Sequence, residues 1–517
     1  MQTLSSDGYL TDVAYIPGFY PQMAPVALRF VAALNRVVPP AAVGFRYLEL
    51  GCGLGRSLTT LAAANPGGEF VGVDVNDEHT ATAAREIAAG SLANARVVTT
   101  VFADLPTDLG RFEFIALHGV FSWVSAEVRE QILGVIRRHL APGGLVLVSY
   151  NALPGWAHLQ PIRGILRQYA ALRQGDSIQR VRDALAYLVF IRDRHAKYFE
   201  DNPPAAAYVD KLLKQDARYL AHEYLNEHWT SFYFADVAGM FATADLGFVG
   251  SLPLFTNFWD LCVRPEFQEL FRSTNNRLVT EAHKDFCANT AFRWDIYTAA
   301  PRRMPELVDR LMDADDLHFR IARPGITLPY QANLGVVTST VQGPLYQTLV
   351  GMLADRSLRL SEILADGRVA GTPQADVARA VDVGVAVGLF DVTAATVGGS
   401  TFDLNAALQV PSAFNRAILA SESLGGRPVA LASTVTGTGH TLGDLDAAML
   451  HELIERGRDG LAGRVETRLA GSGRTLQKEG VTVTDSTERT RLVANACDAF
   501  LQAGLPQLAR LGIVANA

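Results

Sequence analysis

Apolar and polar positions alternate between strand-like runs and helix-like periods over residues 46–151. The strand candidates are short, continuous apolar runs, and apolar residues recur with helical spacing in the segments between them. Five strands are predicted: RYLELG (46–51), EFVGVDV (69–75), ARVVTTVFAD (95–104), FEFIALHGV (112–120) and GLVLVSYN (144–151). Strand–helix alternation with continuously apolar strands is typical of a parallel, doubly wound α/β sheet. A Rossmann-like sheet is therefore the predicted fold class.

The helices of this region carry recognisable start and stop signals. Asn76 is a candidate N-cap, with acidic residues in the first turn after it and Gly90 as the stop. Ser125 can cap the helix that runs to Leu140, which ends in basic residues. Both patterns favour helices packed between the predicted strands.

A helical insertion of about residues 152–245 follows the fifth strand. The segment is largely helical in pattern, aromatic and charged, and Pro203–Pro204 interrupts it. Two further strand candidates, GFVGSLPLF (247–255) and FRWDIYTAA (292–300), could complete the same sheet. The insertion would then cover the carboxyl edge of the sheet, and the domain of residues 46–304 would end near PRRMPELVDR.

The remaining residues, 305–517, are predicted to form a separate α+β domain, and residues 1–45 an N-terminal cap segment. Helices closing on a strand at about 340–395 resemble a winged helix. The segment TPQADVARAVDVGVAVGLF takes the place of the recognition helix in a DNA-binding winged helix. It has one Arg, no Lys and two Asp, so it lacks the basic side chains that bind phosphates and bases. We therefore expect it to pack internally or against a partner, in substrate docking or in a homodimer.

Composition narrows the class of protein further. Hydrophobic residues make up 49% of the 517 positions and the formal net charge is −7. This balance argues against a general affinity for nucleic acid or anionic membranes. The four cysteines show no paired short spacing, and neither a signal-peptide pattern nor an apolar run of about 20 residues occurs. The expectation is a cytoplasmic protein without a membrane partner.

The stretch YLELGCGLGRS carries the first candidate chemistry. Gly51, Gly53 and Gly55 form a tight turn after the first strand, but the third glycine of a dinucleotide fingerprint is replaced by Arg56. Glu49 would repel a pyrophosphate, whereas it suits a cofactor carrying an ammonium and a sulfonium. The loop, with Cys52 as a small, inert member, therefore predicts S-adenosylmethionine binding, with S-adenosylhomocysteine as the product.

Two more acids stand at the ends of successive strands. Asp74 can accept hydrogen bonds from both ribose hydroxyls, and Asp104 can accept from the adenine amino group. Val75 and Phe102 offer apolar faces to the ring, and Ala103 lies between Phe102 and Asp104. Any one acid at a strand end commonly caps a helix or faces water. Their ordered occurrence with the glycine loop predicts a methyltransferase.

The segments LELGCGLGRSL, FVGVDV, HGVFSWV and VSYNALPGW resemble class I methyltransferases that carry a methyltransferase regulatory domain. HEYLNEHW, FYFADV and FRWDIYTA resemble the helical insertion and final strand of that family, and the resemblance covers about residues 15–300. The family includes rickettsial-type protein-lysine methyltransferases acting on an outer-membrane surface protein. Leu54 and Phe121 depart from the family pattern, which bears on the substrate rather than on the cofactor.

Candidate residues for the transfer itself follow the fourth and fifth strands. His118 could contact the cofactor, help to remove a proton, or merely bond to backbone, and Tyr150 and Asn151 could position the acceptor nitrogen or simply pack and turn. Trp123 and Trp156 are candidates for either pocket wall or core. Upstream, YIPGFYP contains Tyr15 and Tyr20. Tyr20 is a candidate lid over the cofactor, with packing against the sheet as the alternative.

Three hypotheses for function remain. The leading one is a protein-lysine N-methyltransferase, for which aromatic walls would favour a deprotonated amine and tolerate the cationic product. The second is methylation of a small molecule or natural product, and the third a protein that binds the cofactor only as a structural or sensing ligand. A metal site is not expected, because HEYLNEH places Asn226 where a zinc-protease motif needs its second histidine.

Overall fold

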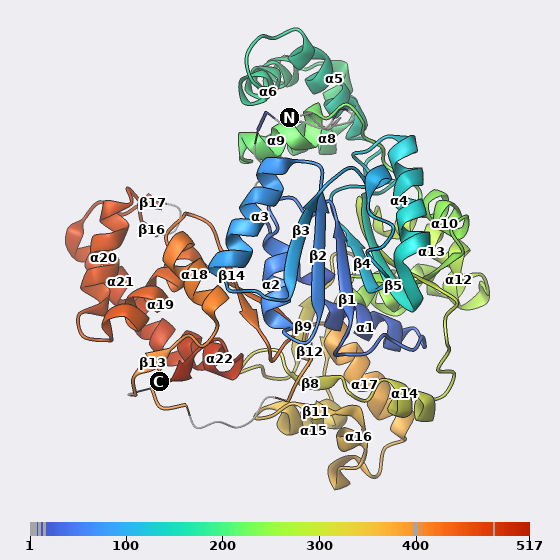
Figure 1. Cartoon of the computed structure of the whole chain (residues 1–517), viewed down its shortest axis with the longest axis vertical. Coiled ribbons are helices and arrows are strands. Elements are labelled where there is room, and N and C mark those ends of the chain that lie inside the picture. The colour runs from blue at the N-terminus through green and yellow to red at the C-terminus, as the bar shows by residue number, and fades with distance from the viewer. Residues whose placement is uncertain (1–7, 9–11, 14–16, 397–401, 405, 479–480) are drawn as a thin grey trace.

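Figure 1 shows the whole chain as a computed structural model, which describes residues 8, 12–13, 17–396, 402–404, 406–478 and 481–517. Tyr15 lies outside these described residues. Seven strands form the central sheet in the order β3-β2-β1-β4-β5-β7-β6. They are β1 (Arg46–Leu50), β2 (Glu69–Asp74), β3 (Ala95–Thr99), β4 (Phe112–Leu117), β5 (Leu140–Asn151), β6 (Leu246–Leu252) and β7 (Phe292–Ala299).

The strand directions are those of a doubly wound sheet with an antiparallel edge. β1 pairs in parallel with β2 and β4, and β3 and β5 extend the parallel part on either side. β7 runs antiparallel to both β5 and β6. The predicted Rossmann-like sheet is confirmed, and both late strand candidates belong to it.

Four helices flank the part of the sheet described so far. They are α1 (Pro25–Leu34), α2 (Arg56–Ala64), α3 (Asp77–Ala89) and α4 (Ala126–His139), with short 3-10 turns at Pro21–Met23 and Phe102–Asp104. Two of them, α3 and α4, begin where their predicted caps place them. The Asn76 side chain accepts from the backbone N–H groups of Glu78 and His79, and Ser125 accepts from that of Val128. The third strand is shorter than predicted, because the chain turns into the 3-10 helix at Phe102.

The two faces of the sheet bury different cores. Tyr47, Leu145 and Leu147 belong to the core beneath α1 and α2, whereas the alternate positions Leu48 and Val148 belong to the core beneath α4 and α10. Side chains of one strand point to opposite faces in turn, so neighbouring residues fall into different cores. This alternation decides which residues at the strand ends can face a ligand.

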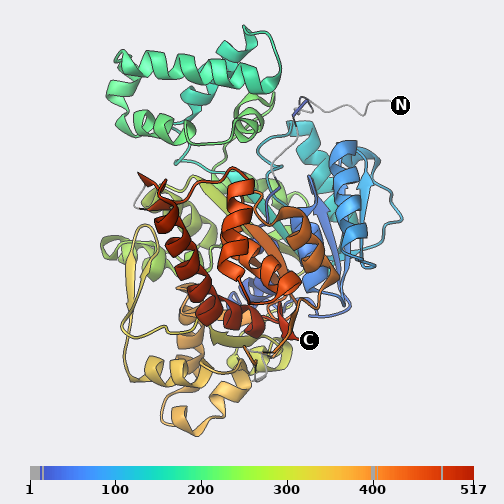
Figure 2. The same cartoon turned by 90° about the vertical axis from the view of Figure 1, so that its left-hand side faces the viewer.

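The predicted insertion is helical and lies beyond one end of the sheet (Figures 1 and 2). Its helices are α5 (Gln160–Ala171), α6 (Ser177–Asp193), α7 (Lys197–Asp201), α8 (Pro203–Leu212), α9 (Ala217–Leu225) and α10 (Phe234–Ala242). Most of the insertion has its own buried cluster, which includes Trp156, Leu188 and Tyr224. α10 differs, because Val237 and Phe241 pack on the sheet.

Short helices connect the last two strands of the sheet. They are a 3-10 turn (Leu254–Asn257), α11 (Trp259–Cys262), a second 3-10 turn (Pro265–Phe267), α12 (Gln268–Ser273) and α13 (Arg277–Ala288). The buried Arg293 on β7 pairs with Glu281 and Asp285 of α13 at 2.9 and 2.6 Å. These ion pairs attach the connection to the edge of the sheet.

The next segment packs on the amino-terminal helix α1. It contains α14 (Leu307–Asp313), β8 (His318–Ile321), β9 (Tyr330–Asn333), β10 (Thr338–Val341), α15 (Pro344–Leu353), β11 (Leu358–Arg359), α16 (Leu360–Leu364), a 3-10 turn (Gly367–Val369), α17 (Gln374–Ala386) and β12 (Phe390–Thr393). β12 belongs to a three-stranded sheet of order β11-β8-β12, and α17 packs on it. The winged-helix arrangement stays a prediction.

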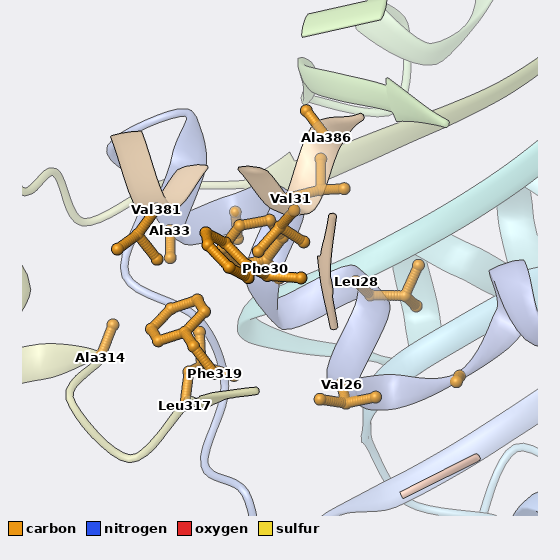
Figure 3. Packing of buried hydrophobic residues seen from close by; sticks show 14 of the residues in the cluster. Val26, Leu28, Phe30, Val31, Ala33, Ala314, Leu317, Phe319, Val381 and Ala386 are labelled. Carbon is orange, nitrogen blue, oxygen red and sulfur yellow. The ribbon is translucent and has the colours of Figure 1, made fainter. Parts of the chain in front are cut away.

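Figure 3 shows side chains of α1 between α17 and the segment around β8. The Phe30 and Phe319 rings meet edge to face with centroids 5.9 Å apart, and the buried Arg29 pairs with Asp316 at 2.7 Å. Residues 304–390 thus share the core of α1 and the sheet rather than forming a core of their own.

A further body follows, with a separate core between residues 410 and 514. Its elements are β13 (Leu408–Gln409), α18 (Ala413–Glu422), β14 (Val429–Ser433), β15 (Thr438–Leu442), α19 (Asp444–Arg456), α20 (Leu461–Gly471), β16 (Gln477–Lys478), β17 (Val481–Thr482), α21 (Ser486–Ala499), a π-helix (Phe500–Gly504), α22 (Leu505–Arg510) and β18 (Ala515–Asn516). This body lies beside α2 and α3 (Figures 1 and 2). The predicted carboxyl-terminal domain is therefore divided between two cores.

Candidate cofactor and acceptor site

A cavity of about 720 Å³ lies at the carboxyl ends of the parallel strands. Its walls come from the segments that follow β1, β2, β3, β4 and β5, from the chain before α1, and from the insertion. Ligands of open α/β sheets bind at this edge, where the strand order reverses on either side of β1. Residues of the insertion line the cavity at this edge.

The glycine loop forms one wall and needs its glycines for two different reasons. Gly51, Gly53 and Gly55 all have positive φ, at +75°, +52° and +80°, a region that favours glycine. A Cβ on Gly51 would lie 2.4 Å from Val120 Cγ2, and one on Gly55 would lie 2.5 Å from Ala83 Cβ. No atom lies within 4 Å of the Cβ position of Gly53, so this residue borders open space.

Asp74 joins the loop to the second strand. Its Oδ2 accepts from the Gly53 N–H at 2.8 Å and its Oδ1 from the Asn76 N–H at 2.9 Å. An ionised carboxylate has about four acceptor sites, so these two bonds leave capacity for ligand hydroxyls. Asp74 lines the cavity, as do Val75 and Cys52.

Glu49 is a buried acid with an unsatisfied oxygen. Its side chain lies in the cavity wall, and no hydrogen bond reaches Oε2. Burial, with the charge of Asp74 as a second cause, raises the pKa of Glu49 to about 8. A bound cation would satisfy this carboxyl and lower its pKa.

His118 lies between aromatic rings at the end of β4. Its ring stacks on Trp294 with centroids 4.2 Å apart, Tyr20 contacts it at 3.9 Å, and its Nδ1 lies 2.7 Å from Ser149 Oγ. Burial lowers the pKa of His118 to about 3, so the imidazole is neutral and weakly basic at pH 7. This environment supports positioning of the cofactor over proton removal.

Tyr20 lies where a lid over the cofactor is expected. Its backbone N–H donates to Ser57 Oγ at 3.1 Å, which attaches the segment before α1 to the start of α2. Its ring lines the cavity next to His118. Tyr20 therefore lies in the cavity wall, and its role as a lid over the cofactor stays a prediction.

Only some of the residues predicted to contact the adenine ring line the cavity. Val75, Phe102 and Ala103 line it, but Asp104 does not. Asp104 is exposed at the end of the 3-10 turn, because the strand ends at Thr99 and the turn redirects the following residues. Its expected position facing the ring is corrected, and Thr100 and Val101 line the cavity instead.

Tyr150 also lies away from the cavity. It is fully buried on the opposite face of β5, where its hydroxyl donates to Asp295 Oδ2 at 2.6 Å. Side chains alternate along a strand, so Ser149 and Asn151 can face the site and Tyr150 cannot. The expected place of Tyr150 beside an acceptor is corrected for this reason, whereas Asn151 lines the cavity.

A further part of the wall of the same cavity comes from the insertion and from the neighbouring ends of two strands, and we call this part the acceptor chamber. It is lined by residues of the insertion and of the ends of β5 and β7: Asn151, Trp156, Tyr219, His222, Glu223, Asn226, Ala291 and Phe292. Trp123 also reaches the cavity, and Trp156 meets Trp229 edge to face at 4.8 Å. Aromatic, amide and carboxyl groups therefore line the same cavity as Glu49, Asp74, His118 and the glycine loop, which we call the cofactor half.

Sequence reasoning missed several of these residues. Glu223 and His222 occur in HEYLNEH, a segment that the sequence links to the family's helical insertion and excludes as a metal motif, without giving either residue a place in the site. The His222 Nε2 lies 2.8 Å from the Val13 carbonyl oxygen. From the sequence, Trp294 is predicted only to lie on a strand. Alternation along β7 could have placed Trp294 on one face, but only the fold shows that this face meets His118.

Metal-binding groups and membrane-spanning helices both bear on the nature of the site. Within the part of the chain that the structure describes, no group of three His, Cys, Asp or Glu side chains could hold a metal ion. No helix among the described residues is both long enough and apolar enough to cross a membrane.

The donor set fits S-adenosylmethionine. The unsatisfied Glu49 oxygen suits an ammonium, Asp74 has acceptor capacity for hydroxyls, and the open space at Gly53 admits a ligand close to the backbone. The fold and this cavity define a class I methyltransferase that uses S-adenosylmethionine.

Comparisons with known proteins agree with this class. A family model described as a methyltransferase domain matches residues 48–146, and one described as a predicted methyltransferase regulatory domain matches residues 216–299. The uncharacterized protein sll1526 of Synechocystis sp. is 30% identical over 513 residues, covering 98% of this chain and 99% of that protein. The chain belongs to the family of methyltransferases that carry a methyltransferase regulatory domain.

Two other similar proteins come from Rickettsia. The uncharacterized protein RP789 of Rickettsia prowazekii is 30% identical over 299 residues, covering 56% of this chain and 52% of that protein. The structure of PKMT2 from Rickettsia typhi in complex with AdoHcy superposes with a TM-score of 0.72 at 19% identity, covering 97% of this chain and 99% of that chain. The fold likeness thus extends over all parts of the chain.

Proposed function

We propose that the protein transfers the methyl group of S-adenosylmethionine to the side-chain nitrogen of lysine in a protein. The observation that carries the proposal is the acceptor chamber, where aromatic side chains, Asn151 and Glu223 adjoin the cofactor half of one cavity. Trp156, Tyr219 and Phe292 supply aromatic surface in it. Aromatic surface accepts both the lysine stem and a methylated, cationic product.

Within the cofactor half, each role follows from the chemistry of the side chain. Glu49 would bind the ammonium of the methionine part, and Asp74 the ribose hydroxyls. Tyr20 and His118 would cover the reacting centre and exclude water, which methyl transfer requires because the protein mainly aligns its reactants.

Similarity to other methyltransferases, in sequence motifs and in fold, also supports lysine as the acceptor. The motifs around His118 and Asn151 resemble those of the rickettsial-type protein-lysine methyltransferases, and the whole-chain fold is that of PKMT2. Fold likeness alone says little about substrate, so the chamber carries the proposal.

A second candidate is methylation of a small amine or natural product. The cavity volume of about 720 Å³ lies within the range of small-molecule sites, which favours a compact acceptor. The cofactor half would be unchanged in this case, and only the identity of the acceptor would differ.

One labelling experiment separates the two candidates. The protein is incubated with a bacterial extract and S-adenosylmethionine tritiated in its methyl group, and protein and small-molecule fractions are then separated. We expect label in protein, recovered as methylated lysine after acid hydrolysis. Label confined to small molecules would support the second candidate, and label in other protein residues would contradict the lysine acceptor.

A further inference from the structure

Glu223 is a buried carboxyl that the binding of the cofactor does not use. It lies on α9 of the insertion, forms part of the acceptor-chamber wall and is only 8% exposed. A buried acid is costly for a protein unless a partner compensates it. A bound cationic acceptor would supply such a partner.

The neighbours of Glu223 leave it incompletely compensated. Asn151, the Arg163 guanidinium and Trp229 lower its pKa, but burial dominates and raises the pKa to about 7. Arg163 is engaged elsewhere, because its Nη2 donates to the Asn226 carbonyl oxygen at 2.5 Å and its guanidinium lies 5.2 Å from the Trp229 ring centroid. Among the described residues no ion pair within 4 Å joins Arg163 to Glu223.

The position of Asn151 connects Glu223 to the transfer site. Asn151 ends β5, its backbone N–H donates to Ser122 Oγ at 2.9 Å, and its side chain lies next to Glu223. His118 ends the neighbouring strand β4, so both strand ends open into the same cavity. Glu223 therefore lines the same cavity as Glu49, Asp74 and His118, and it lies beside Asn151, the residue expected to hold the acceptor nitrogen.

We propose that Glu223 binds the acceptor amine as its ammonium ion and then takes the proton that the nitrogen must lose before it attacks the methyl group. This inference rests on the proposed function and deepens it, because it selects a protonated primary amine as the substrate. Trp156 and Tyr219 would flank the amine and keep water from it.

The step is balanced in atoms and charge. The N–H bond of the ammonium breaks and its proton bonds to a Glu223 oxygen. The freed nitrogen lone pair forms the N–C bond to the methyl group, while the C–S bond breaks and its electron pair stays on sulfur. The products are neutral S-adenosylhomocysteine and a methylammonium, and Glu223 then returns its proton to water.

A base is needed because free lysine amine is scarce at neutral pH. With a pKa near 10.4, only about one amine in a few thousand is unprotonated at pH 7. A base whose pKa lies near the working pH typically contributes about 10²- to 10⁴-fold. His118 cannot replace it, because its pKa of about 3 makes it a weaker base than Glu223.

Other groups around Glu223 bear on the expected pH profile. Those with an electrostatic interaction with it are Arg163 of α5, Tyr208 of α8, and Tyr219 and Tyr224 of α9. The pKa of each of these tyrosines is raised, so they remain neutral over the working range. Glu49 lines the same cavity, burial raises its pKa to about 8, and saturating S-adenosylmethionine would hold it ionised.

The test compares the wild type, Glu223→Gln and the exposed control Glu227→Gln. Initial rates of tritium transfer into protein lysine are measured from pH 6 to 10, with saturating S-adenosylmethionine and limiting bacterial extract. We expect the wild-type rate to rise through an apparent pKa near 7. Glu223→Gln should lose about 10²-fold at pH 7 and less than about 10-fold near pH 10, where the amine deprotonates unaided.

Calorimetry with S-adenosylhomocysteine checks that the variant is folded, and its affinity should stay within about 2-fold of wild type. Glu223→Asp, which keeps a carboxyl one methylene further back, should retain the pH dependence at a reduced rate. Equal rates for wild type and Glu223→Gln across the range, or a uniform loss with no recovery at high pH, would overturn the role of Glu223. A wild type that labels no lysine would instead overturn the proposed function itself.

Discussion

The cofactor half of the cavity depends on acids whose surroundings differ. Asp74 accepts two backbone N–H donors, whereas Glu49 is buried with one oxygen unpartnered. The pKa of Glu49 is accordingly raised to about 8, with burial as the larger cause. Binding of a ligand ammonium would reverse this, because an opposite charge favours the ionised form.

This linkage predicts pH-dependent binding of S-adenosylmethionine. The pKa of Glu49 is about 8 in the free protein and lower in the complex, so binding near pH 7 should release a proton. Affinity should therefore rise with pH and level off above pH 8. Calorimetry in buffers of different ionisation enthalpy measures the released proton.

In Glu49→Gln the proton release and the pH dependence should both disappear, and affinity above pH 8 should fall about 10- to 100-fold, the range of a charge-assisted hydrogen bond. The exposed Glu78→Gln serves as control. An unchanged pH profile in Glu49→Gln would contradict the placement of the ammonium at Glu49.

The same acid should affect the stability of the free protein. Between pH 4.5 and 8 the folded state keeps a proton on Glu49 that the unfolded state has lost, so unfolding becomes easier as pH rises through this window. His118 acts in the opposite direction, but only up to about pH 6.5. Above that pH the melting temperature should fall more steeply in wild type than in Glu49→Gln. A parallel fall in both proteins would count against the raised pKa.

Successive side chains of β5 point to opposite faces of the sheet, so adjacent residues have different surroundings. Asn151 faces the cavity, whereas Tyr150 belongs to the core beneath α4 and α10. The Tyr150 hydroxyl is one of several donors to the buried Asp295 carboxylate, together with Ser251 and Arg293. Tyr150 thus supports the edge of the sheet, and Asn151 serves the acceptor chamber.

A pair of substitutions tests this division. Tyr150→Phe should lower the free energy of unfolding by about 1–3 kcal/mol, because the buried Asp295 loses a donor, while the affinity for S-adenosylmethionine stays within about 2-fold. Asn151→Ala should lower methyl transfer with a smaller effect on stability. Chemical denaturation and calorimetry provide both measurements. Loss of cofactor affinity in a stable Tyr150→Phe variant would contradict the packing role.

The carboxyl-terminal body contacts the segment next to the glycine loop through Glu422, which lies 366 positions after Arg56 in the chain. Arg56, the first residue of α2 and part of the cavity wall, forms ion pairs with Glu86 of α3 at 2.8 Å and with Glu422 of α18. A Cβ on Gly439 would lie 2.7 Å from both Phe19 and Thr60, so β15 packs closely on α2 and on the residue before Tyr20. The body therefore contacts both the start of α2, next to the glycine loop, and the residue before Tyr20.

Removal of one charge tests this contact. Glu422→Gln should weaken S-adenosylmethionine binding about 3- to 10-fold, because Arg56 loses a partner that holds it against the loop. The exposed Glu455→Gln on α19 should bind as wild type does. Equal affinity of both variants, measured by calorimetry, would show that the carboxyl-terminal body does not influence the cofactor half.

The features that could be read from the chain are those set by neighbours in sequence. The strand periods, the Asn76 and Ser125 caps and the glycine turn depend on side chains a few residues apart. Parallel strands joined by helices bring their carboxyl ends to one edge, so the sequence alone predicts that Glu49, Asp74 and His118 converge. The class of cofactor follows from these local patterns.

Contacts between distant segments decided the rest. Glu223 enters the cavity only because the insertion packs over the strand ends, and Glu422 meets Arg56 only because a second core places α18 beside α2. Asp104 lies outside the site because the 3-10 turn directs it away, and Tyr150 lies outside because its side chain is on the other face of β5. Local patterns determine which elements form and where a methyl donor binds. Burial raises the pKa of both Glu49 and Glu223, and tertiary packing decides which side chains are their neighbours. Burial arises only when segments far apart in sequence exclude water together.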